Sequence, residues 1–156
     1  MRLFGLLLLL MLGAKFRAAA EPGLSFQTFD LLIEGAPAAW QVELVYPAAA
    51  KIVGLEGGEP PFAEPPTYDR RGLEGGRILI AAYTLEEGRF SAKTLRVARL
   101  HFAVPENEEL SAKVLLLAAA RPGGRRYEPK IFLRESEPES DSEVIPEHSP
   151  KKEVGP

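Results

Sequence analysis

Two histidines and a few serines are the side chains of this chain that could serve as base and nucleophile in a hydrolytic reaction. His101 alternates with Leu100 and Phe102, which is typical of an outward, solvated position on a strand. His148 lies in an acidic stretch with too few apolar residues to hold a catalytic geometry. No serine has a histidine at a suggestive spacing, although a triad can form in space from distant residues. We therefore predict that the protein is not an enzyme.

Metal-ligating side chains are similarly scarce. The 156 residues include 0 Cys and 2 His, so a transition-metal site is not expected. Calcium held by loop carboxylates is a weaker alternative, because no Asp-rich loop is present. The carboxylates in question are those of Glu56, Glu64, Asp69 and Glu74. We predict no cofactor, with structural calcium as the alternative.

The amino terminus has the pattern of a secretory signal peptide. Arg2 precedes an apolar run from Leu3 to Leu12, and the small residues Ala18 to Ala20 follow. This run is shorter than the roughly 20 apolar residues that span a bilayer. We predict a signal peptide over residues 1–20, a secreted, periplasmic or extracellular location, and no stable membrane span after cleavage. Cleavage after Ala14 and an uncleaved anchor are the alternatives.

The rest of the chain is acidic. Residues 1–20 contain 3 of the 19 basic residues and none of the 22 acidic ones, so their removal leaves 16 basic residues and a net charge of -6. This charge disfavours nucleic acid as a partner. From Glu135 onward the chain is mostly Glu, Ser, Pro and Lys with little to bury. We predict a disordered acidic tail over residues 135–156 and one domain over residues 21–134.

Alternation of apolar and polar residues predicts an all-β domain. From Trp40 to Tyr46 every second residue is large and apolar, which is the period of a strand with one buried face. In the run that begins at Lys93 the apolar parity changes, so a bulge is expected near Ala98 or Arg99. Short strands without crossover helices favour an antiparallel β-sandwich. The other strand-like runs are Leu24 to Glu34, Arg77 to Tyr83, Lys93 to Val104, Lys113 to Ala120 and Lys130 to Arg134.

A family resemblance fits this architecture. Ala39 to Pro47, followed by Lys51 to Leu55, resembles the strand and following turn of cohesin domains, where an alternating strand ends in Tyr-Asp-Pro before an apolar stretch. Gly76 to Ala82 and Leu95 to Phe102 resemble two later strands in the same order. The resemblance covers residues 24–134. It implies a jelly-roll sandwich of about eight or nine strands, related to carbohydrate-binding modules, whose flat sheet face docks a partner such as a dockerin.

Two departures change the partner that this resemblance implies. Cohesins carry polar recognition residues, typically Asn and Asp, where this chain has Ala39 and Gln41. The Asp expected before Pro47 is also absent. We therefore expect a cohesin-like sandwich that binds another exported protein, or a polysaccharide, in place of a dockerin.

Both faces of the strand from Arg77 to Tyr83 are apolar, which indicates a candidate binding surface. Leu79, Ala81 and Tyr83 share one of these faces. Gln41 and Glu43 on a neighbouring strand would supply polar contacts around this apolar centre. The alternative is a central strand that is covered on both sides.

The Pro-rich stretch from Glu59 to Tyr68 is a second candidate surface. Paired prolines favour a stiff, extended backbone, so Phe62 and Tyr68 could be presented on a rigid loop. The alternative is a loop that covers a sheet edge and places Phe62 in the core.

These surfaces lead to three hypotheses about function. The first is a non-catalytic binding module that contacts another protein through a sheet face or the Pro-rich loop. The second is a carbohydrate-binding module, which needs exposed aromatic rings; Trp40 and Tyr46 have the inward parity of core residues, whereas Tyr127 is expected to be exposed. The third is an assembly component that polymerises through strand edges.

Overall fold

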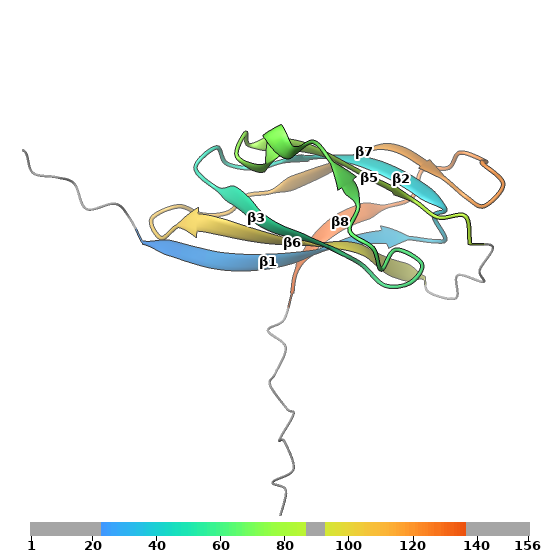
Figure 1. Ribbon diagram of the computed structural model, residues 1–156, viewed down its shortest axis with the longest axis horizontal. Coiled ribbons are helices and arrows are strands. Elements are labelled where there is room, and N and C mark those ends of the chain that lie inside the picture. The colour runs from blue at the N-terminus through green and yellow to red at the C-terminus, as the bar shows by residue number, and fades with distance from the viewer. Residues whose placement is uncertain (1–22, 87–92, 137–156) are drawn as a thin grey trace, which may run out of the picture.

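The computed structural model describes residues 23–86 and 93–136. These residues form two four-stranded antiparallel sheets packed against each other (Figure 1), which confirms the predicted all-β sandwich. The predicted signal peptide over residues 1–20 lies outside the described residues, and so does the predicted tail from residue 137 onward. The jelly-roll topology implied by the resemblance stays a prediction.

One layer, called here the β1 sheet, has the strand order β3-β6-β1-β8. Its strands are β1 (Leu24–Glu34), β3 (Lys51–Gly57), β6 (Thr94–Pro105) and β8 (Ile131–Glu135). The other layer, the β2 sheet, has the order β4-β5-β2-β7. Its strands are β2 (Ala39–Val45), β4 (Thr67–Tyr68), β5 (Arg77–Tyr83) and β7 (Lys113–Ala120). A short 3-10 helix, η1 (Arg70–Leu73), connects β4 to β5.

The predicted strand bounds agree with the structure for β1, β5 and β7. Two strands were missed: β3, whose alternation is interrupted by a register shift between Ile52 and Gly54, and β4, which has 2 residues. Glu135, assigned from the sequence to the tail, is the last residue of β8 and pairs with Phe29. The ordered domain therefore extends slightly beyond its predicted end.

The core lies between the sheets and is formed by the inward side chains of both. Phe102 is at its centre, with its ring 5.9 Å from the ring of Phe29 and 5.6 Å from that of Tyr46, both edge-on. Trp40 and Tyr46 are buried, as their parity predicted. Burial of these rings and of the aliphatic side chains around them stabilises a domain that has no disulfide bond.

The predicted bulge is present in β6. Leu31 pairs with Ala98 and Leu32 pairs with Arg96, so Val97 is the extra residue on the β6 side. Val97 and Ala98 are both buried as a result. The bulge returns the apolar residues on either side of it to the same core face.

Candidate functional site

The outer side of the β2 sheet brings together five of the seven residues predicted to bind a partner. Strand pairing places Gln41 opposite Ala81 and Glu43 opposite Leu79. Tyr83 follows in the next outward row of β5. Leu79 is 40% exposed and Tyr83 is 75% exposed, so the alternative in which this strand is covered on both sides is wrong.

Sequence reasoning missed the contribution of β7 to the same surface. Leu115 pairs with Glu43 on the opposite side from Leu79, and Leu117 is the extra residue of a bulge in β7. The two side chains are 52% and 51% exposed. The signal was present in the apolar run of β7, but the lateral neighbours of a strand cannot be read from its own residues. We call the outward residues of β5, β2 and β7 the apolar face; its apolar side chains are those of Ala39, Val45, Leu79, Ala81, Tyr83, Leu115, Leu117, Ala118 and Ala120.

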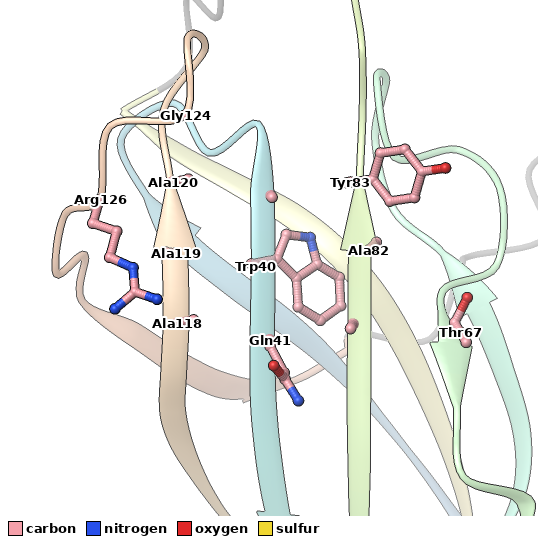
Figure 2. A pocket seen from close by; sticks show the side chains of 12 residues that line it. Trp40, Gln41, Thr67, Ala82, Tyr83, Ala118, Ala119, Ala120, Gly124 and Arg126 are labelled. Atoms are coloured by element: carbon pink, nitrogen blue, oxygen red, sulfur yellow. The ribbon is translucent and has the colours of Figure 1, made fainter.

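Small residues make a trough at one end of the apolar face. Ala39, Ala81 and Ala118 line a cavity of about 370 Å³ there, because alanine leaves space between the strands' larger side chains. Figure 2 shows the Tyr83 ring and the Arg126 guanidinium on opposite sides of this trough. The trough therefore has an alanine floor, an aromatic wall and one cationic group.

The middle strand of the apolar face carries polar groups. Gln41 and Glu43 lie on β2 between the apolar side chains of β5 and β7, and Glu43, with a side chain that is 13% exposed, forms an ion pair with Arg77. Lys113 lies at the same end of the face as Arg77, whereas Arg126 lies at the opposite end. Two apolar strands therefore flank a partly polar one, and the two ends of the face carry positive groups.

The Pro-rich loop does not present its aromatic residues as a binding surface. Phe62 is 3% exposed, and its ring packs edge-on against that of Trp40 at 6.2 Å. The Phe62 carbonyl accepts a hydrogen bond of 2.6 Å from the Gly58 N–H, which folds the loop onto the sandwich. Tyr68 lies in β4 and packs partly against the core. The alternative reading, a covering loop with Phe62 in the core, is the one that the structure shows.

The outer side of the β1 sheet is polar in its central part and internally paired. The buried carboxylate of Asp30 accepts a hydrogen bond of 2.8 Å from Arg99 Nε, and Arg96 and Arg134 lie 3.9 and 3.8 Å from its oxygens. Burial raises the pKa of Asp30, but the Arg99 hydrogen bond and the charges of Arg99 and Arg96 outweigh it and hold the pKa below its ordinary value of 3.8. Asp30 is therefore a charged hub in the folded protein.

Next to this hub, three side chains form the line of contacts that a hydrolytic triad would use. Thr28 Oγ1 is 3.1 Å from His101 Nδ1, and His101 Nε2 is 2.9 Å from Glu56 Oε1. The sequence did not reveal this, because the three residues lie on three strands. Thr28 lies on the flat outer side of a central strand, whose N–H groups are taken up by the sheet ladder and are not available to stabilise an oxyanion. We interpret the contacts as cross-strand pairing between side chains. The sequence predicted a solvated His101, whereas in the structure its ring contacts Thr28 and Glu56 at hydrogen-bond distance.

Three of the four carboxylates considered for calcium, those of Glu56, Asp69 and Glu74, have separate partners. Glu56 contacts His101, Glu74 lies 3.7 Å from Lys51, and Asp69 caps η1 by accepting a hydrogen bond from the Arg71 N–H. Within residues 23–86 and 93–136, no three His, Cys, Asp or Glu side chains are grouped so that they could hold a metal ion. Calcium therefore gains no support from these positions.

Tyr127 differs from its expected exposure. It is half-buried, with the Arg121 guanidinium 4.8 Å from its ring centroid, and burial raises the pKa of its hydroxyl. A ring covered in this way offers no open surface for stacking on a sugar.

No family model, curated protein or solved structure matches the chain. Among the described residues, none lies in a helix with the length and apolar character needed to span a membrane. The apolar face is therefore identified as a candidate binding site from its geometry alone.

Proposed function

We propose that the protein is an exported, non-catalytic binding module that contacts another exported protein through the apolar face. The observation that carries this proposal is the exposure of Leu79 and Tyr83 on β5 and of Leu115 and Leu117 on β7, the two strands that flank β2. Contiguous exposed apolar side chains on a soluble protein mark interaction sites. Export itself rests on the signal-like pattern of residues 1–20.

The shape and charge of the face describe the partner that fits it. An apolar side chain can enter the trough of Ala39, Ala81 and Ala118, where burial of apolar area contributes about 25 cal/mol per Å². Arg126, which lines the trough, and Lys113, at the opposite end of the face, favour acidic groups on the partner.

Capture by the immobilised, purified protein from the exported proteins of its source cells tests this proposal. Leu79→Asp and Tyr83→Asp place charges at the centre and end of the face, and each should reduce capture of a bound protein by about tenfold or more. Phe26→Asp is the matched control, because Phe26 is 73% exposed but lies in the other sheet. Capture that is unchanged by Leu79→Asp would contradict the proposal.

The polysaccharide alternative has weaker support. Among the described residues of the apolar face, Tyr83 is the one aromatic side chain, whereas stacking on sugars normally uses several. Retention on a polysaccharide that is lost in Tyr83→Ala and kept in Leu79→Asp would replace the protein partner with a glycan.

A further inference from the structure

Three arginines lie close together in the sequence directly after β7. Arg121, Arg125 and Arg126 are all exposed, and the Arg121 guanidinium lies over the Tyr127 ring. Within the part of the chain that the structure describes, no carboxylate forms an ion pair with any of the three. We call these three residues the arginine turn. Guanidinium groups that lack an anionic partner favour the binding of carboxylates.

The arginine turn adjoins the alanine trough of the apolar face. Arg126 reaches the trough (Figure 2), and the residues that line the trough include no carboxylate. Next to the trough, and sharing Tyr83 with it, is a cavity of about 320 Å³ that is lined by Arg121 and Leu85. A ligand that fits this end of the face therefore has an aliphatic side chain for the trough and a carboxylate beside it.

The chain itself contains a segment with this chemistry. Residues 137–156 include six acidic residues and two lysines. Two of the three large aliphatic side chains in this stretch form the pair Val144 and Ile145. Glu143 precedes the pair directly, and Glu147 follows it after one proline. In an extended segment Glu143, Ile145 and Glu147 share one side, because side chains alternate with a period of two.

The position of Ser136 puts this segment within reach of the trough. The Ser136 N–H donates a hydrogen bond of 2.8 Å to the Thr28 carbonyl. Thr28 lies about 20 Å along β1 from Glu34, near which β2 begins at Ala39 and lines the trough. Since the sheets are about 10 Å apart, the total distance is roughly 25 Å. The stretch from Ser136 to Ile145 spans up to about 30 Å when extended.

We propose that residues 143–147 dock on the apolar face of the same chain, with Ile145 in the alanine trough and Glu143 beside Arg126. The occupant is this segment because its charge is opposite to that of the arginine turn and its tether matches the distance. A short tether also provides an effective concentration on the order of millimolar, so a weak contact suffices. The docked segment occupies one end of the apolar face, but docking needs no other protein and does not rest on the proposed function.

Paired cysteines in the full-length chain test the docking, because the chain has 0 Cys. Ala118→Cys places a thiol in the trough, and Pro146→Cys places one next to Ile145. In dilute protein with oxidised glutathione, this pair should form an intramolecular disulfide about fivefold faster than the pair of Leu115→Cys and Pro146→Cys. Mass spectrometry of the monomer measures both rates.

Leu115 is the matched control because it is exposed on the same strand but lies outside the trough. It pairs with Glu43, farther from Ala39 and hence closer to the level of Ser136, so an undocked segment would favour it. Equal rates, a faster disulfide at Leu115, or disulfides mainly between two chains would overturn the proposal.

Charge exchange in the protein with Ala118→Cys and Pro146→Cys tests the ionic contact. Arg126→Glu should slow the disulfide about threefold, and adding Glu143→Lys should restore the rate, because the two charges are exchanged. Arg70→Glu is the control, since it makes the same change of charge at an exposed arginine in η1. A rate that Arg126→Glu leaves unchanged, or that Arg70→Glu lowers equally, contradicts the contact.

Removal of the aliphatic side chain tests the occupant of the trough. Ile145→Ser should slow the same disulfide about fivefold, whereas Val154→Ser, an aliphatic change outside the docked residues, should not. Equal effects of the two changes would overturn the assignment of Ile145. These measurements use no partner protein, so their failure leaves the proposed function intact, and unchanged capture in Leu79→Asp would contradict that function without affecting the docking.

Discussion

The two outer sides of the sandwich expose different kinds of side chains to water. On the β1 sheet, Asp30 forms ion pairs with the three arginines around it, and His101 links two neighbouring strands. On the β2 sheet, Leu79 and Leu115 flank Glu43 and remain exposed. A face whose charges are already paired gains little from a partner, whereas exposed apolar area gains about 25 cal/mol per Å² when it is covered. The difference supports our proposal that the apolar face serves recognition, whereas the polar face serves stability.

Removing the carboxylates of Asp30 and Glu43, one from each face, should give the largest difference in the free energy of unfolding. Asp30→Ala is expected to lower the free energy of unfolding by about 2–3 kcal/mol, because three arginines lose the buried carboxylate that they share. Glu43→Ala should cost less than about 1 kcal/mol, since its partner Arg77 is mostly exposed. Urea denaturation of both variants provides the measurement, and equal losses would break the comparison.

Acid should weaken the same hub. The pKa of Asp30 is lower in the folded protein than its ordinary value of 3.8, so its stabilisation is fully present above pH 3.8. It is then lost as the pH falls through the folded pKa. The stability difference between the native protein and Asp30→Asn should therefore be constant near neutral pH and shrink in acid below pH 3.8. A difference that grows as the pH falls would show that the carboxylate is not held in its charged form.

Removing the histidine contacts should have a smaller effect. His101→Gln is expected to cost about 0.5–1.5 kcal/mol, the usual contribution of a partly exposed hydrogen bond, because Glu56 is 61% exposed. Urea denaturation measures this loss. Turnover of an activated ester by the native protein that is abolished in His101→Gln would instead give the three side chains a catalytic role.

Polar substitution on the apolar face should have the smallest effect on stability. Leu79→Ser and Leu115→Ser are expected to change the free energy of unfolding by about 0.5 kcal/mol or less, since Leu79 is 40% and Leu115 is 52% exposed in the folded protein. Thermal unfolding at low protein concentration keeps self-association out of this measurement. A loss above about 2 kcal/mol in either variant would assign these leucines to the core.

Local pattern was sufficient for the long strands and insufficient for the interrupted ones. Strand-like runs bounded by turn residues or charge predicted β1, β5 and β7 with their observed bounds, because each of these strands is continuous in the sequence. β3 contains Gly54 and a register shift, and β4 has 2 residues, so neither has a period to detect. The placement of Phe62 was likewise undecided, because a proline-flanked aromatic fits both a covering loop and a presented one.

The chain by itself determined that this is an all-β sandwich, that Gln41 and Glu43 share one face of their strand, and that Leu79, Ala81 and Tyr83 share one face of theirs, because a period of two places alternate side chains on the same face. Tertiary structure decided which strands are neighbours, and thereby joined Leu115 and Leu117 to that surface, buried Phe62, and gathered Arg96, Arg99 and Arg134 around Asp30. The physical reason is that lateral pairing joins residues far apart in the chain through packing and hydrogen bonds that no short window of sequence contains.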